Sequence, residues 1–245
     1  MSPLDFTVEE LDIYYTDADG TSYKLLSDNL AGMLSTNADG QPVQLYITNA
    51  YGKGPEEITN TIGDGVLKGT LDILNKSGGF DNPPSDIRGI GYYEKSLDSL
   101  VATFAETLNK LNESPKIDPA TGKPEVDANG DPVMEKHDLF EAIDPNQPMS
   151  ASNIKIADGW ANGDYGITIS NVQVPNGEGD NSTGETADEN VLKMIKALSE
   201  DRQFSYTDPA DPTGNPVDFY KGNFYNCFVN MENILNIDLK AGNST

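Results

Sequence analysis

The segment from Tyr92 to Asn112 constrains the fold more than any other part of the sequence, because its apolar residues recur at intervals of three and four. This spacing places them on one side of an α-helix and leaves polar residues on the other side. Ser114-Pro115 follows the segment, and proline disfavours further helix. The apolar side holds Tyr93, Leu97, Leu100, Val101, Phe104, Leu108 and Leu111, and the polar side holds Lys95, Asp98, Glu106 and Lys110.

Two more segments have helical spacing. The first covers about 187–200 and presents Val191, Met194, Ile195 and Leu198. The second covers about 217–235 and presents Tyr220, Phe224, Phe228, Met231 and Leu235, with Tyr225 and Ile234 beside them. The prolines of 207–216 exclude helix between the two. We expect the three apolar stripes to bury one another, which makes a small helical layer.

The remaining sequence is typical of short strands and turns. The Asp17–Gly20 stretch between 11–15 and 21–26 predicts a hairpin. Residues 43–48 alternate apolar and polar side chains, and 153–156 and 165–170 are further candidate strands.

The sequence therefore predicts an α+β fold with three main helices and β-rich lobes of antiparallel hairpins inserted between the helices. We expect three parts along the chain. These are a β-rich segment 1–59, a discontinuous helical domain 60–115 plus 185–240, and an inserted β-rich lobe 116–184.

The net charge of the chain excludes some classes of binding partner. The chain carries 40 Asp and Glu against 16 Lys and Arg, a formal net charge of −24. Such a surface repels phosphate backbones and anionic lipid, so we expect no nucleic-acid partner and no membrane partner. No apolar run approaches the ~20 residues of a membrane span, and the first residues lack the basic and apolar regions of a cleaved signal peptide.

Motifs for catalysis are missing from the sequence. His137 is the only histidine and Cys227 the only cysteine, so sites that need two imidazoles or a disulfide are excluded. A Ser-His-acid arrangement through His137 stays formally open, but no nucleophile elbow accompanies it. The glycines of 63–69 miss the dinucleotide-binding spacing by one residue. A glycosidase-type pair of carboxylates stays open by counting alone, although nothing singles out two of the 40 acidic residues. We expect a protein that is not an enzyme, with no catalytic residue and no cofactor.

One acidic stretch is similar to a calcium-binding loop. Asp127, Asn129, Asp131 and Asp138 stand at positions 1, 3, 5 and 12 of such a loop. Position 6 is Pro132, which cannot take the positive φ that the loop needs there. We therefore expect hairpin turns and no resident metal, while calcium binding by these four residues stays open at this point.

Two blocks together resemble the flagellar hook-associated protein family, of the hook-associated protein 1 (hook–filament junction) type. The first is Gly63-Asp-Gly-Val-Leu-Lys-Gly69-Thr-Leu-Asp-Ile-Leu-Asn75, and the second is Tyr93-Glu-Lys-Ser-Leu-Asp-Ser-Leu-Val-Ala-Thr-Phe-Ala-Glu-Thr-Leu-Asn109. Leu139-Phe140, the strand-like 153–160, Gly179-Asp-Asn181 and the helical 190–198 follow in the family's order. The resemblance covers about 61–112 and 138–235.

The resemblance implies a structural role that adapts the hook to the filament, with hook protein, neighbouring copies of itself and the next junction protein as partners. It implies an extracellular location on the bacterial flagellum and export without a cleaved signal peptide. The family's terminal polymerisation helices have no counterpart here, so we expect a monomeric central and outer fragment. The alternative is an extracellular binding or adhesin module with calcium-stabilised loops.

Overall fold

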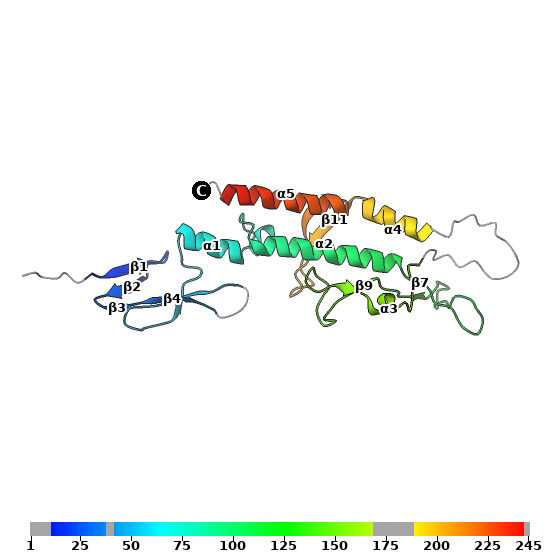
Figure 1. The fold of residues 1–245 in the computed structure, drawn as a ribbon, viewed down its shortest axis with the longest axis horizontal. Helices are drawn as coiled ribbons and strands as arrows, with labels where there is room; N and C mark the ends of the chain where they lie inside the picture. The colour runs from blue at the N-terminus through cyan, green and yellow to red at the C-terminus, as the bar shows by residue number, and fades with distance from the viewer. Residues whose placement is uncertain (1–10, 38–41, 169–188, 243–245) are drawn as a thin grey trace, which may run out of the picture. The chain divides into compact units, whose positions relative to one another are not determined.

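The computed structural model describes residues 11–37, 42–168 and 189–242. The chain divides into two compact units, Met1–Tyr92 and Tyr93–Thr245. Helices and small antiparallel sheets occur together, so the predicted α+β class is confirmed (Figure 1). The three-part division expected from the sequence stays a prediction.

The first unit contains two three-stranded antiparallel sheets. One has the order β1-β2-β3 and consists of Ile13–Thr16, Ser22–Ser27 and Leu30–Ala31; the other has the order β4-β5-β6 and consists of Met33–Thr36, Leu45–Thr48 and Glu56–Glu57. The predicted hairpin is β1-β2. Its turn closes on Asp17, whose Oδ1 accepts the N–H groups of Asp19 at 3.1 Å and Thr21 at 2.8 Å.

An aliphatic cluster forms the core of the first unit. Its buried members are Leu45, Ile47, Ile58, Ile62 and Leu71, with Tyr15, Tyr23, Leu25 and Val43 packed against them. Helix α1 (Gly65–Asn75), which the sequence did not predict, contributes Leu71 alone as a buried residue. A short 3-10 helix, Gly78–Phe80, follows it.

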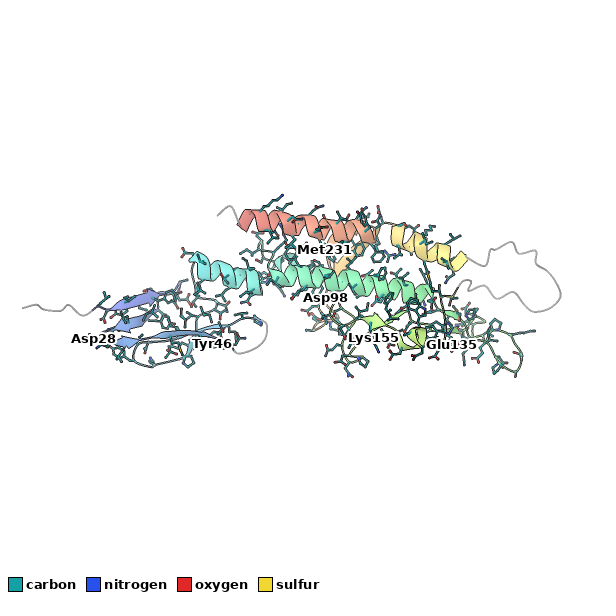
Figure 2. All side chains as sticks on the ribbon, in the orientation of Figure 1. Asp28, Tyr46, Asp98, Glu135, Lys155 and Met231 are labelled. Carbon is teal, nitrogen blue, oxygen red and sulfur yellow. The ribbon has the colours of Figure 1, made fainter. Side chains whose placement is uncertain are left out.

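Helices form the frame of the second unit. The predicted first helix is α2 (Ile90–Leu111), and the predicted second helix is α4 (Glu189–Ser199). In the third, α5 (Phe224–Gly242), Met231 lies on the side that faces α2 (Figure 2). Leu100, Phe204, Phe224, Cys227 and Met231 form one core cluster of this unit, and Leu108, Leu139 and Met194 form another.

The prediction of helix from residue 217 is wrong. Residues Val217–Gly222 form strand β12, which pairs antiparallel with β11 (Arg202–Tyr206) and brings Tyr220 opposite the fully buried Phe204. The cross-strand ladder satisfies this backbone, and helix begins only after Asn223. The Oδ1 of Asn223 accepts the N–H of Asn226 at 2.8 Å, as an N-cap does.

The predicted core stripe of this third helix is confirmed at Phe224 and Met231 and wrong at Phe228 and Leu235. Phe224, Cys227 and Met231 are buried, whereas Phe228 and Leu235 are 53% and 40% exposed. Neighbouring residues on a helix are about 100° apart, so with Cys227 in the core the next residue, Phe228, lies on the adjacent side of α5.

Short elements lie between α2 and α4. They are β7 (Ser114–Pro115) paired with β8 (Met134–Glu135), β9 (Phe140–Glu141) paired with β10 (Lys155–Ile156), and α3 (Asp158–Ala161). The predicted strand at 153–156 is confirmed in part as β10. The strand predicted at 165–170 is wrong for 165–168, where the N–H and hydroxyl of Thr168 bond to Asn112, and 169–170 lie outside the described residues.

Within the described part of the chain, no helix has the length and apolar character needed to cross a membrane.

Candidate functional site

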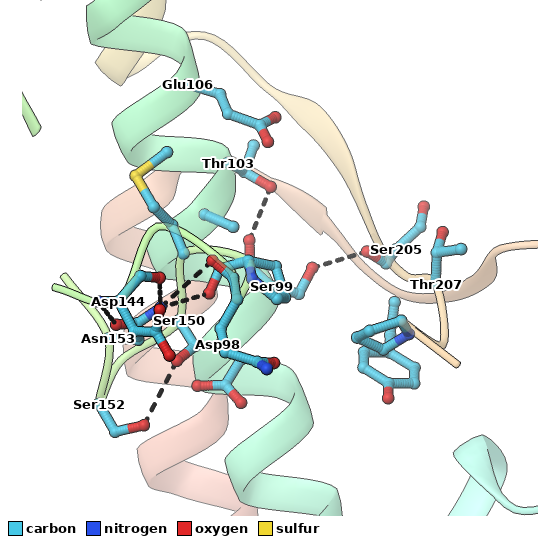
Figure 3. Close-up of a pocket in the computed structure, with 16 residues that line it drawn as sticks. Asp98, Ser99, Thr103, Glu106, Asp144, Ser150, Ser152, Asn153, Ser205 and Thr207 are labelled. Atoms are coloured by element: carbon cyan, nitrogen blue, oxygen red, sulfur yellow. Dashed lines mark hydrogen bonds between the residues drawn. The ribbon is translucent and has the colours of Figure 1, made fainter. Parts of the chain in front are cut away.

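The second unit contains a pocket between α2, the loop 144–153 and the chain at the end of β11 (Figure 3). Its volume is about 620 Å³, within the ~300–1,000 Å³ usual for ligand sites. We call it the α2 pocket. Its lining residues are Asp98, Ser99, Ala102, Thr103, Glu106, Asp144, Gln147, Pro148, Met149, Ser150, Ser152, Asn153, Ser205, Tyr206, Thr207 and Pro209.

Helix α2 supplies one wall. Asp98, Ala102 and Glu106 are four residues apart, so they share one face of the helix, and the backbone positions of Asp98 and Glu106 are about 12 Å apart along its axis at ~1.5 Å per residue. The small side chain of Ala102 leaves the space between them open. On the neighbouring row, the hydroxyl of Ser99 donates to the carbonyl oxygen of Ser205 at 2.6 Å, which fastens β11 to α2.

The loop 144–153 supplies the second wall and is braced internally by one amide side chain. The Oδ1 of Asn153 accepts the N–H of Asp144 at 2.8 Å, and its Nδ2 donates to the carbonyl oxygens of Asp144 at 3.2 Å and Pro148 at 2.9 Å. The N–H of Ala151 donates to Oδ1 of Asp98 at 2.8 Å. These bonds hold the wall in place in the free chain, which lowers the entropic cost of binding.

Tyr206 forms part of the third wall and experiences a negative potential. Burial raises the pKa of its phenol, and the carboxylates of Asp208 and Asp98 raise it further. The ammonium of Lys95 lies over the ring at 5.3 Å from its centroid. The aromatic wall of the α2 pocket therefore already accepts an ammonium group from this chain.

The charges that line the α2 pocket have one sign. Asp98, Glu106 and Asp144 contribute carboxylates, and the lining contains no Lys, Arg or His. The sequence places Asp98 and Glu106 on the polar side of a helix and 144–148 in a turn, and it does not predict that the two meet in one pocket. The four-residue spacing of Asp98, Ala102 and Glu106 was the available signal, but nothing in the sequence joined it to a loop about 40 residues away.

A second surface feature runs along α5. Tyr225, Phe228, Leu235 and Leu239 are 74%, 53%, 40% and 56% exposed. They follow the three-and-four spacing of a helix-packing row, with Glu232 at the position between Phe228 and Leu235. We call this row the outer stripe. Since Phe224, Cys227 and Met231 already face α2, α5 is apolar on two sides.

The predicted calcium-like residues form a hairpin turn. Asp127 Oδ1 accepts the N–H groups of Asn129 at 2.8 Å and Asp131 at 2.9 Å. These bonds, that from Asp131 first, lower the pKa of the Asp127 carboxyl. In the described ranges no three His, Cys, Asp or Glu side chains lie where they could share an ion, so Asp138 does not complete a site with Asp127 and Asp131.

His137 has a hydroxyl and a carboxylate near its ring. Ser114 Oγ lies 3.2 Å from Nδ1, and Glu135 Oε2 lies 3.9 Å from Nε2, beyond hydrogen-bond length. Tyr165 stacks on the ring with 4.9 Å between centroids. The carboxylate does not orient the imidazole as a catalytic triad requires.

Comparison with known proteins finds no family model that matches the chain and no curated protein of similar sequence. The fold class and the two surface features, the α2 pocket and the outer stripe, are therefore the structural observations from which a function can be argued.

Proposed function

We propose that this chain is a structural component of the bacterial flagellum at the hook–filament junction, without catalysis. The proposal starts from the sequence resemblance in 61–112 and 138–235. The observation that supports it best is the outer stripe of α5, because a helix with apolar residues on two sides is stable in water when a second partner covers the outer side.

On this proposal, the outer stripe packs against a helix of a neighbouring flagellar subunit. Its three-and-four spacing is that of left-handed helix packing, in which each apolar residue fits between residues of the facing helix. The acidic, turn-rich surface of both units faces the medium outside the cell. Export then proceeds without a cleaved signal peptide, and nucleic acid and membrane are not partners.

The test of the role is localisation in the organism that encodes the chain. An epitope inserted in the exposed turn 119–122 is detected by immunogold electron microscopy. We expect gold in a short band between hook and filament, and we expect deletion of the gene to leave hooks without attached filaments. Label along the whole filament, or confined to the cell body, contradicts the proposal.

The test of the stripe uses two substitutions on the same helix. Phe228→Asp puts a carboxylate into the outer stripe, and Asn233→Asp adds the same charge at an exposed position outside it. We expect the first variant to fold with an unchanged circular dichroism spectrum yet fail to enter flagella, and the second to assemble normally. Equal assembly of the two variants contradicts a role for the stripe.

The effect of calcium on thermal stability distinguishes the adhesin alternative from the junction role. A module stabilised by calcium unfolds at a higher temperature with millimolar calcium than with chelator, because a ligand that binds the folded state stabilises it. We expect equal unfolding temperatures, since the Oδ1 of Asp127 already accepts two backbone N–H groups.

A further inference from the structure

We propose that the α2 pocket binds a short, extended, basic segment of a partner protein, with a Lys or Arg side chain entering between Asp98 and Glu106. This inference is independent of the junction role, because it rests on the pocket alone.

The carboxylates determine the charge of the occupant. Asp98 keeps one oxygen for the Ala151 N–H and has a second oxygen for a ligand, and Glu106 is exposed with no intramolecular partner among the described residues. Asp144 stands on the opposite wall. A cation that bridges these walls gains charge-assisted hydrogen bonds that a neutral side chain cannot form.

The negative charge at the third wall attracts a cation of this chain, because the ammonium of Lys95 lies over the Tyr206 ring at 5.3 Å from its centroid. That ring is therefore already in contact with an ammonium, and the basic side chain of the partner lies beside it. A basic side chain with an apolar stem fits next to it, since Ala102, Met149 and Pro209 supply apolar surface in the same pocket.

The neutral groups favour a peptide over a free polyamine. The hydroxyl of Thr207 and the amide of Gln147 have no intramolecular partner among the described residues and can donate to a peptide carbonyl, whereas a polyamine offers no acceptor. The ~12 Å along α2 between positions 98 and 106 equals the length of about three to four extended residues.

A second copy of this chain is a poor occupant. Each copy carries a net charge of −24, so bringing another acidic surface against three carboxylates costs electrostatic energy. The partner that fits is a protein that presents Lys or Arg in an exposed loop or tail.

The experiment follows the ¹H–¹⁵N spectrum of the 245-residue chain during titration with three probes. They are the peptide acetyl-Ala-Arg-Pro-Lys-Ala-amide, the same peptide with Gln in place of both basic residues, and spermidine. We expect the basic peptide to shift the amide signals of Ala102, Ala151 and Thr207 selectively, and the Gln peptide to leave them in place.

Two double variants test whether peptide binding depends on the carboxylates of the α2 pocket or on the negative charge of the whole chain. Asp98→Asn with Glu106→Gln removes two charges from the pocket, while the new amide at position 98 keeps an acceptor for the Ala151 N–H. Asp131→Asn with Asp164→Asn removes two exposed charges elsewhere in the same unit. We expect the first pair to weaken the basic peptide by about tenfold or more, and the second to change its affinity less than about twofold.

Glu106→Gln alone is the variant that preserves folding, because its side chain is exposed, and we expect it to weaken the peptide in the same direction. The proposal is wrong if the basic peptide does not bind, if its shifts spread over the acidic turns, or if both double variants weaken it equally. If spermidine shifts the same amide signals by the same amount, the α2 pocket is a site for free polyamines and the proposal is wrong.

Discussion

The two units differ in how much they rely on side-chain amides to hold their parts together. In the first unit, β5 and α1 meet through aliphatic side chains, with Ile47 and Ile58 each 1% exposed, and Asn75 at the end of α1 bonds to the N–H and carbonyl of Val43 at 2.7 and 2.8 Å. In the second unit, the segments around β9 and Thr168 are joined to the end of α2 by three asparagines, of which Asn112 and Asn190 are fully buried. Apolar packing tolerates imperfect partners, whereas each buried polar group that loses its hydrogen-bond partner costs free energy.

The asparagines act on backbone groups. Asn109 Oδ1 accepts the N–H groups of Leu139 at 2.8 Å and Phe140 at 3.0 Å, and its Nδ2 donates to the Phe140 carbonyl at 2.7 Å. Asn190 Nδ2 donates to the carbonyl oxygens of Leu111 and Thr168, both at 2.6 Å. Such bonds fix the position of a chain segment without requiring that it pair with a neighbouring strand.

The largest expected effect is on the aliphatic core. Ile47→Ala should lower the free energy of unfolding of the first unit by about 2–5 kcal/mol, from lost burial and the cavity left behind. The matched control is Ile73→Ala on α1, 56% exposed, which should change it by less than about 0.5 kcal/mol. Denaturant titration with hydrogen exchange of the β4 and β5 amides measures both. Equal losses would show that α1 contributes as much as the sheet.

The next effect is on the asparagine junction. Asn112 Nδ2 donates to the carbonyl oxygens of His137 at 2.6 Å and Gly166 at 3.2 Å, and its Oδ1 accepts the Thr168 N–H at 2.7 Å. Asn112→Leu leaves these groups unpaired, and we expect a loss of about 2–4 kcal/mol. Hydrogen exchange should accelerate at 137–139 and 166–168.

The control for this prediction is Asn236→Leu, at an exposed position of α5, which should leave exchange unchanged. If Asn112→Leu also accelerates exchange in β5 of the first unit, the two regions do not open independently and the comparison fails.

Cys227 tests whether the helical core of the second unit opens with the asparagine junction. Burial raises its thiol pKa to about 12, so at pH 8 iodoacetamide should react at least about 100-fold more slowly than with a free cysteine. We expect Asn112→Leu to leave this rate unchanged. A parallel increase in labelling and in exchange at 137–139 would show that the core and the junction are one cooperative unit.

The raised pKa of the Cys227 thiol also predicts a loss of stability at alkaline pH. Its folded pKa lies above the ordinary value of 9.0, so the stabilising contribution of the neutral buried thiol is complete below pH 9 and is lost as pH rises toward 12. Cys227→Ala should remove that part of the alkaline destabilisation, measured by thermal unfolding between about pH 8 and 11.

The smallest expected effect is the pH dependence of the carboxyl groups in the exposed turns. Backbone N–H groups lower the carboxyl pKa of Asp127 and of Asp118, the largest contributions coming from Asp131 and Ala120 respectively. A lowered pKa means that the contribution to stability is present above the ordinary value of 3.8 and is lost as pH falls through the folded pKa. An NMR titration should place both midpoints below 3.8.

Asp127→Asn is the matched variant for the turn, because an amide oxygen accepts the same N–H groups without titrating. We expect its Asn129 amide signal to stay constant through the acid range, whereas the signal moves in the parent chain. A first unit that loses its fold over the same pH range would contradict the view that aliphatic packing is its main source of stability.

The spacing of apolar residues predicted an element correctly where that element buries one face. It predicted α2, which the structure confirms to within about two residues, and the Asp17 turn predicted the β1-β2 hairpin. It was wrong at 217–222, where helical spacing and strand alternation overlap in a short apolar run. The Asn223 cap was the missed signal for the helix start, whereas the buried row depends on what α5 packs against.

The sequence by itself determined the α+β class, the main helices and the acidity, because these depend on side-chain spacing and composition along short stretches. Only the tertiary structure decided which row of α5 is buried, that Asn112 reaches His137, Gly166 and Thr168, and that the loop 144–153 joins α2 in one pocket. The reason is physical: an amide or a carboxylate can bond to any backbone group, and only the fold selects which one lies within reach.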